Sequence, residues 1–175
     1  MEFADPGPGR PRGGVAFAAG LWLALACGGA GAGAPEAPEA PDFALKALDG
    51  RNYRLSEYRG EVVAVVFWAS WCGGCRPELE RLERLRAVYG DAGFRVLGVT
   101  IDEETGQARA IAAGMGVGFP QLHDAAKDVS RAYRPGALPT TVLIDRSGAI
   151  RYRYRDLDSR EERAMLGELR RLLDE

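Results

Sequence analysis

Residues 61–68 (EVVAVVFW) form a nearly continuous run of β-branched and aromatic side chains. Such a run is typical of a strand that is covered on both faces, because a strand with one wet face alternates polar and apolar residues. The sequence therefore predicts a central strand at this position. The rest of the domain has to supply a covering layer on each side of it.

The segments after this strand alternate between helical and strand spacing. A surface helix is predicted over residues 75–90, where Leu79, Leu82, Leu85, Val88 and Tyr89 recur at three- and four-residue intervals among charged side chains. A second buried strand is predicted over residues 94–101 (FRVLGVTI), and a helical pattern follows through residues 108–115. The order strand, helix, strand, helix implies a right-handed parallel crossover.

Two hairpins and a last helix complete the pattern. Asp49-Gly50, between two alternating segments, predicts a hairpin ahead of the main sheet, and residues 140–154 predict a closing hairpin with its turn at 146–148. A C-terminal helix is predicted from Ser159, where Glu162 completes a capping box. Its apolar face comprises Met165, Leu166, Leu169 and Leu172. The prediction is an α/β fold with a central mixed sheet, flanking helices and an added N-terminal β-hairpin.

Composition limits the partners. The chain has 175 residues, of which 46% are hydrophobic, enough for one packed domain of ordinary size. Its formal net charge of −2 gives no basic field that would attract nucleic acid or anionic lipid. We therefore expect no nucleic-acid partner and membrane contact only through the N-terminus. We also expect a monomer.

The N-terminus has the layout of an export signal. Arg10 and Arg12 precede the uncharged apolar run 15–26 (VAFAAGLWLALA), which ends in small residues. The uncharged stretch continues to Ala34, so an uncleaved membrane anchor is an alternative. Cys27 resembles the lipidated cysteine of bacterial lipoproteins, although Ala24 stands where that motif usually has Leu. Otherwise Cys27 is removed with the signal or lies in the anchor.

A tether separates this leader from the folded part. The APEAPEAP repeat at residues 34–41 cannot bury enough surface to fold. We divide the chain into a signal or anchor (1–27), a disordered tether (28–40) and one domain (41–175). An exported protein, periplasmic or anchored so that it faces the periplasm, follows from either interpretation of the leader.

Cys72 and Cys75, separated by Gly73-Gly74, follow the central strand directly. A C-x-x-C motif occurs in redox pairs and in halves of zinc sites. A structural zinc site needs four ligands, and the chain adds only Cys27 and His123, so we expect no metal. Two inert buried thiols would suit a strand or helix, whereas the glycine pair indicates a loop.

The remaining interpretation is a redox pair. Cys72 would lie at the amino end of the 75–90 helix, where free N–H groups and the helix dipole stabilise an anion. We expect such a position to lower the pKa of the Cys72 thiol from the ordinary cysteine value of about 8.5. We expect Cys72 to attack and the more deeply placed Cys75 to resolve the mixed disulfide. Trp71, Gly73 and Gly74 are predicted to contact the substrate, Trp71 by an exposed apolar surface.

These motifs together resemble the thioredoxin superfamily. The resemblance rests on residues 67–79 (FWASWCGGCRPEL), 138–141 (LPTT) and 145–148 (DRSG). It is greatest to the extracytoplasmic TlpA/ResA-like branch, because the predicted hairpin and residues 56–60 (SEYRG) are absent from plain thioredoxins. The similarity runs from Pro41 to the C-terminus.

The resemblance assigns further site residues. Pro139 would be a cis-proline that faces the cysteines, and Leu138 would offer its backbone groups to an extended substrate segment. Glu78 matches an acid that ResA-like proteins place near their cysteines, where it would relay protons to or from Cys75; pairing with the helix dipole is an equally good explanation. Two residues depart from the family pattern. Val66 occupies the place of the buried acid that thioredoxins carry on the central strand. Glu80 occupies the place of the proline that usually kinks the helix after the cysteines, which puts that kink in doubt.

The implied function is an extracytoplasmic thiol-disulfide oxidoreductase without a cofactor. Its partners would be disulfide-bearing protein substrates and a membrane thiol-electron donor, as in cytochrome c maturation or redox homeostasis. The glycine pair offers the thiolate no side-chain donor, so a reductant is favoured over an oxidant. Two alternatives share the fold: a thiol peroxidase, although residues 65–71 lack the proline that precedes its cysteine, and a copper chaperone that pairs Cys72 and Cys75 with His123.

Overall fold

The computed structural model describes residues 37–155 and 159–175. The predicted signal or anchor, Cys27 and most of the predicted tether lie outside the described residues. Within the described part, no helix combines the length and apolarity that crossing a membrane requires.

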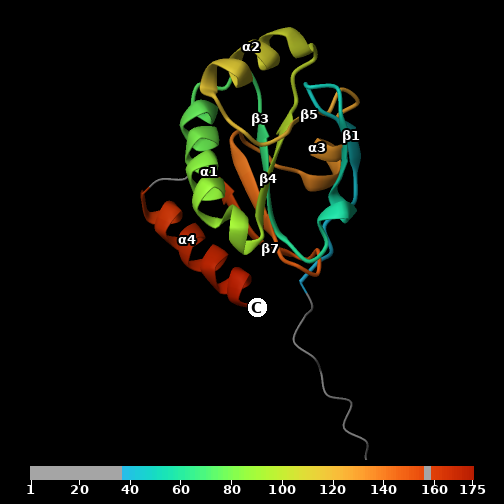
Figure 1. Cartoon of the computed structure of the whole chain (residues 1–175). Coiled ribbons are helices and arrows are strands. Elements are labelled where there is room, and N and C mark those ends of the chain that lie inside the picture. Colours follow the sequence, from blue (N-terminus) through green and yellow to red (C-terminus); the bar gives the residue numbers. More distant parts are fainter. Residues whose placement is uncertain (1–36, 156–158) are drawn as a thin grey trace, which may run out of the picture. The chain divides into compact units, whose positions relative to one another are not determined.

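The described part contains a five-stranded sheet in the order β5-β4-β3-β6-β7 and a separate two-stranded sheet, β1-β2 (Figure 1). The strands are β1 (Ala44–Lys46), β2 (Asn52–Arg54), β3 (Val62–Trp68), β4 (Phe94–Thr100), β5 (Gln121–His123), β6 (Thr140–Ile144) and β7 (Ile150–Arg155). The α-helices are α1 (Cys75–Tyr89), α2 (Thr105–Met115), α3 (Asp128–Tyr133) and α4 (Ser159–Asp174), and the 3-10 helices are η1 (Leu55–Tyr58) and η2 (Gly90–Ala92).

β3 is the central strand that the sequence predicts. All of its residues are buried, and it pairs with β4 on one side and with β6 on the other. The β3–β4 pair is parallel, which confirms the predicted crossover through α1, and the β3–β6 pair is antiparallel, so the sheet is mixed. β6 and β7 form the predicted closing hairpin. The α/β fold with an added N-terminal hairpin is therefore confirmed.

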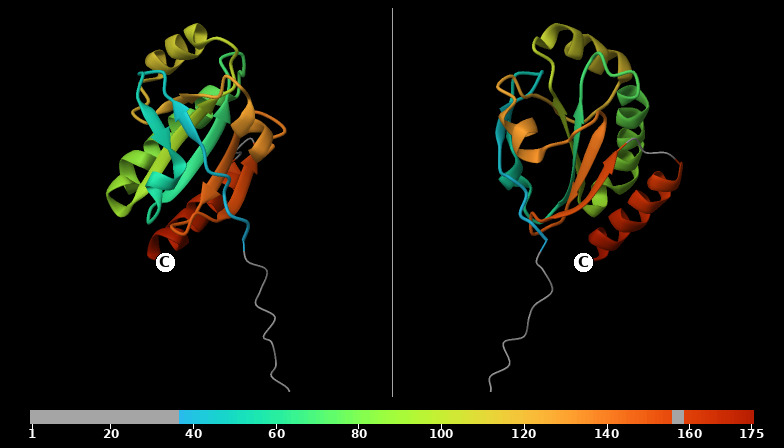
Figure 2. Two further views of the ribbon diagram at one scale, coloured as in Figure 1. Left: turned by 90° about the vertical axis from the view of Figure 1, so that its right-hand side faces the viewer. Right: turned by 180° about the vertical axis from the view of Figure 1, so that it is seen from behind.

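The two faces of the sheet are covered by different layers. Val62, Ala64, Val66 and Trp68 of β3 pack in one core with apolar side chains of α1, α2 and α4. The intervening residues of β3 pack in a second core with the β1-β2 hairpin, η1 and α3. Figures 1 and 2 show α1 and α4 on one side of the sheet and the hairpin with α3 on the other. Hydrophobic burial on both faces is what excludes polar residues from β3.

The predicted apolar face of α1 is right except at its end. Leu79 and Leu82 are fully buried, while Val88 has 69% of its surface exposed. Val88 lies roughly 120° around the helix from Leu82, so it leaves the stripe that faces the sheet. On α4, Met165, Leu169 and Leu172 are buried as predicted. Leu166 is only half-buried.

The folded part begins earlier than the predicted boundary at Pro41. Ala40 is buried and its N–H donates to the carbonyl of Gly148, while Ile150 donates to the carbonyl of Pro38. Glu39 forms an isolated bridge with Ala149. Residues 38–40 therefore belong to the domain rather than to the tether, because they pair with the β6–β7 turn. Proline and glutamate in the sequence do not reveal a pairing with a segment so far along the chain.

Two short elements, β5 and α3, are not predicted by the sequence pattern. β5 has three residues and α3 has six, too few for a periodicity to be recognised. α3 is held by Asp124, whose carboxylate accepts hydrogen bonds from the N–H groups of Val129 and Ser130. These contacts satisfy backbone donors at the start of the helix.

A pair of substitutions on α1 tests how the helix is held. We expect Leu82→Ala to lower the free energy of unfolding by about 2–5 kcal/mol, because it removes buried methyl groups and leaves a cavity. Val88→Ala on the same helix should change it by less than about 0.5 kcal/mol, since this side chain is exposed. Urea denaturation of both variants measures the difference. Equal losses would mean that α1 does not pack through Leu82.

Candidate active site

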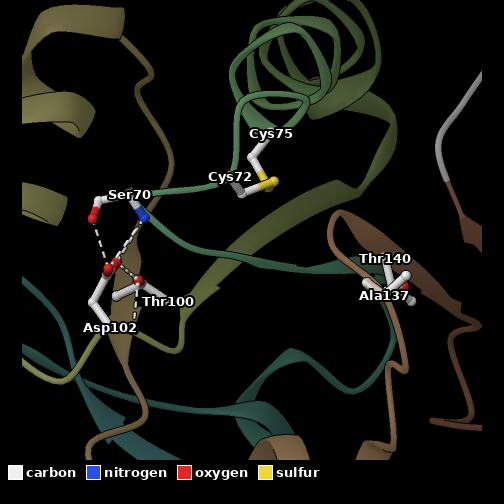
Figure 3. The surroundings of a disulfide bond; sticks show 7 residues. All are labelled: Ser70, Cys72, Cys75, Thr100, Asp102, Ala137 and Thr140. Carbon is white, nitrogen blue, oxygen red and sulfur yellow. Dashed lines mark hydrogen bonds between the residues drawn. A yellow bond between two sulfur atoms is a disulfide. The ribbon is translucent and has the colours of Figure 1, made fainter.

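The two cysteines of the motif are bonded to each other. The Cys72–Cys75 disulfide has an S–S distance of 2.06 Å and a Cα–Cα distance of 5.4 Å, and it lies at the amino end of α1 (Figure 3). Cys75 is 1% exposed. Cys72 is half-buried and so is the more accessible of the two. The attacking role of Cys72 and the resolving role of Cys75 stay predictions.

The backbone between β3 and α1 is folded into tight turns around the disulfide. The N–H of Cys72 donates to the carbonyl of Ala69 (3.1 Å), and the N–H of Cys75 donates to the carbonyl of Cys72 (3.2 Å). α1 begins at Cys75 with Gly74 as its N-cap and no side-chain cap. The positive end of the helix dipole at the amino end of a helix favours negative charge nearby. A thiolate on Cys72 would benefit from it.

Pro139 lies against the cysteine turn. The Leu138–Pro139 peptide bond is cis, as the resemblance implies. A Cβ atom placed on Gly74 would be 3.8 Å from the Pro139 ring, so the two segments are in van der Waals reach. Thr140 shapes this loop: its hydroxyl lies 3.0 Å from the carbonyl oxygen of Pro135 and 2.7 Å from that of Ala137 (Figure 3).

The surface beside the disulfide is open and partly apolar. Trp71 is 69% exposed, unlike Trp68, which is fully buried in the core. A Cβ atom on Gly73 would meet nothing within 4 Å, so this glycine also faces open space. A large exposed aromatic next to a redox pair is a suitable contact for another protein. Contact between these residues and a substrate stays a prediction.

Glu78 is a buried carboxylate on the first turn of α1. It is 4% exposed, and its Oε1 accepts a hydrogen bond of 2.7 Å from the hydroxyl of Thr141. Its Oε2 lies 3.7 Å from a guanidinium nitrogen of Arg81. Thr141 is in register with Val66, the buried strand residue that the resemblance aligns with the thioredoxin acid. The acid therefore enters this part of the core from α1 instead of from β3.

A polar cluster around Asp102 was not predicted from the sequence. Asp102 is 5% exposed and follows β4, and its carboxylate accepts hydrogen bonds from Ser70, two residues before Cys72, and from Thr100 (Figure 3). β3 and β4 are parallel, so their carboxyl ends meet at one edge of the sheet. The sequence signal that could have predicted this cluster is the pair Ser70 and Asp102, two polar residues that each follow the end of a buried strand by two positions.

His123 contacts the Asp102 segment. Its Nε2 lies 2.9 Å from the carbonyl oxygen of Asp102, and the ring is on β5. Among residues 37–155 and 159–175, no three His, Cys, Asp or Glu side chains are grouped so that they could hold a metal ion. The described residues thus offer no preformed site for the copper alternative.

The chain has clear relatives. A model described as the AhpC/TSA family matches residues 37–153. Thiol-disulfide oxidoreductase ResA of Geobacillus thermodenitrificans (strain NG80-2) is 38% identical over 112 residues, which cover 64% of this chain and 64% of that protein. Thioredoxin-like protein YneN of Bacillus subtilis (strain 168) is 36% identical over 120 residues, or 67% of this chain and 70% of the relative. The match with ResA thus spans slightly less than two thirds of that relative.

A solved structure agrees with these matches. A Chlorobium tepidum protein assigned as thiol:disulfide interchange protein DsbE superposes with a TM-score of 0.74 at 33% identity, covering 78% of this chain and 96% of that one. The family match, the sequence relatives and the shared architecture show that the chain belongs to the AhpC/TSA family, within the thioredoxin superfamily.

Proposed function

We propose that the protein is a thiol-disulfide oxidoreductase that exchanges its Cys72–Cys75 dithiol or disulfide with protein substrates. The observation that carries the proposal is the unequal burial of two bonded cysteines at the amino end of α1, opposite Pro139. The ResA relative and the DsbE-type structure carry names of the same activity.

In the reducing direction the reaction has two steps. The Cys72 thiolate attacks one sulfur of a substrate disulfide, which forms a mixed disulfide and releases the other substrate sulfur as a thiolate that takes up a proton. Cys75 then loses its proton and attacks the Cys72 sulfur, which releases the second substrate thiol. The substrate gains two electrons and two protons, and the protein is left with the Cys72–Cys75 disulfide.

We favour the reducing direction. Gly73 and Gly74 supply no side chain that would donate a hydrogen bond to the thiolate, and strong stabilisation of the reduced form is what makes an oxidant. Turnover then requires a thiol-electron donor in the membrane to reduce the disulfide again. The apolar leader at residues 15–26 supports a location outside the cytoplasm, periplasmic or anchored there. Apocytochrome c and other exported proteins with unwanted disulfides are suitable substrates.

One experiment tests the activity and the peroxidase alternative together. We expect the dithiol form to reduce the disulfides of insulin in the presence of a reducing thiol, and to consume hydrogen peroxide no faster than the thiol alone. Peroxide consumption that depends on Cys72, without insulin reduction, would contradict the proposal and favour a thiol peroxidase.

Glu78 is proposed to accept the proton of Cys75 during the second step. It lies three residues after Cys75 on the same helical turn, in the buried layer. We expect Glu78→Gln to slow release of the substrate from the mixed disulfide by about 100-fold at neutral pH, the lower end of the 10²–10⁴ that general base catalysis contributes. The measurement is the rate of product release as a function of pH.

Glu80→Gln is the matched control for this prediction. Glu80 lies on the same helix, but its side chain is 44% exposed and is paired with Arg76. Thr141→Val, which removes the hydrogen bond to Glu78, should also slow product release, by a smaller factor than Glu78→Gln. If Glu78→Gln releases product as fast as Glu80→Gln at every pH, Glu78 acts only on the helix dipole.

A further inference from the structure

Asp102 connects the end of the second central strand to the segment that carries Cys72. Its Oδ2 is 2.9 Å from the N–H nitrogen of Ser70, and its Oδ1 is 2.7 Å from the Ser70 hydroxyl. The hydroxyl of Thr100 donates to Oδ2 at 2.5 Å. The carboxylate thus accepts bonds from the last residue of β4 and from Ser70, on the connection from β3 to α1 (Figure 3).

Asp102 is itself fixed by the surrounding elements. The N–H of Ile101 donates to the carbonyl of Trp68, which continues the β3–β4 ladder to this point. The carbonyl of Asp102 contacts the Nε2 of His123 on β5 and accepts from Lys127 before α3. A buried acceptor held at both its backbone and its side chain is a rigid support, because leaving its donors unpaired is costly.

Resting on the proposed exchange of Cys72 and Cys75, we infer that Asp102 is a positioning residue for the redox pair. It holds Ser70, and through Ser70 the Trp71–Cys72 turn, in the geometry that the disulfide needs. It does so in the dithiol form as well as in the disulfide form. Its role is to keep the two sulfurs at a high effective concentration. Asp102 contacts neither sulfur and takes no part in the exchange itself.

This role couples the Asp102 contacts to the redox state. In the oxidised protein the Cys72 turn is restrained by the disulfide as well as by Asp102, whereas in the dithiol form the disulfide restraint is gone. Removing the Asp102 contacts therefore frees the turn mainly in the dithiol form, and the gain in conformational entropy favours that form. The disulfide should become easier to reduce.

The test is the equilibrium of the full chain with reduced and oxidised glutathione at pH 7. We expect Asp102→Asn to lower the equilibrium constant for disulfide formation about tenfold, which is about 30 mV for a two-electron couple. The amide keeps one acceptor oxygen in place of two, and it lacks the negative charge that strengthens the hydrogen bonds from Ser70 and Thr100. Ser70→Ala keeps the backbone N–H that donates to Asp102, and it is the less disruptive substitution for folding. It should also lower the equilibrium constant for disulfide formation, by a smaller factor.

The β6–β7 turn offers a matched control. Asp145 accepts hydrogen bonds from the N–H and the hydroxyl of Ser147, as Asp102 does from Ser70. Asp145 lies at the other end of the sheet, since its neighbour Ile144 pairs with Val63 at the start of β3. Asp145→Asn and Ser147→Ala should lower the stability of the dithiol and disulfide forms equally and leave the glutathione equilibrium unchanged.

The outcomes separate this inference from the proposed function. If Asp102→Asn and Ser70→Ala lose stability equally in both redox forms and keep the parent equilibrium, Asp102 is structural and the inference is wrong. Should Asp102→Asn not fold, the Ser70→Ala result alone decides. If the parent protein does not exchange with glutathione at all, the proposed function fails before the variants are compared.

Discussion

Cys72→Ser should abolish turnover with disulfide substrates, to below about one thousandth of the parent rate. Serine is close in size to cysteine, so the variant should fold, but its hydroxyl does not form a disulfide and stays protonated at neutral pH. Cys75 does not replace Cys72 as the attacking residue, because its side chain is almost completely buried. Insulin reduction under a steady supply of reducing thiol measures the effect.

Cys27→Ser is the control for this experiment. Cys27 is the remaining cysteine of the chain, in the predicted signal or anchor and away from the motif in the sequence. Its replacement should leave insulin reduction unchanged. If the Cys72→Ser protein keeps ordinary turnover, then Cys72 is not the nucleophile, and the assignment of roles within the motif is wrong.

Cys75→Ser should separate the two steps of the exchange. Cys72 is still able to attack a substrate, but no second thiol is available inside the protein to release it. We expect substrate proteins to accumulate on Cys72 as mixed disulfides, and catalytic turnover to fall at least about 100-fold. Non-reducing gels followed by mass spectrometry would reveal the adducts and identify their substrates.

The double variant Cys72→Ser/Cys75→Ser is the matched control, since it should form no adduct. Adducts that persist in the double variant would come from Cys27 or from non-specific association. Release of substrate by Cys75→Ser at the parent rate would contradict the resolving role of Cys75. Trapped partners would also test whether exported proteins are the substrates.

The sequence was sufficient to predict the helices and strands whose apolar residues recur at a regular spacing or in a continuous run. β3, β4, α1 and α4 were predicted because each carries a long apolar run or stripe that only burial explains. The site was predicted where motif residues are adjacent in the chain, as with Cys72 and Cys75. The position of Pro139 came from resemblance, because no local pattern links residue 139 to residue 74.

Contacts between residues far apart in the chain could not be predicted from the sequence. The Ser70–Asp102 and Glu78–Thr141 hydrogen bonds join residues 32 and 63 positions apart. Neither pair has a spacing that periodicity detects, and each polar residue taken alone looks like an ordinary surface residue. The pairing of residues 38–40 with the β6–β7 turn was missed for the same reason, since only the folded sheet brings those segments together.

The most direct test of the proposed role of Cys72 is the pH dependence of alkylation of the reduced protein by iodoacetamide, with the modified cysteine identified by peptide mass spectrometry. We predict that Cys72 is modified first and that its reactivity rises with a pKa below the ordinary cysteine value of about 8.5, because the amino end of α1 stabilises the thiolate. Preferential modification of Cys75, or a Cys72 pKa at or above that value, would contradict it.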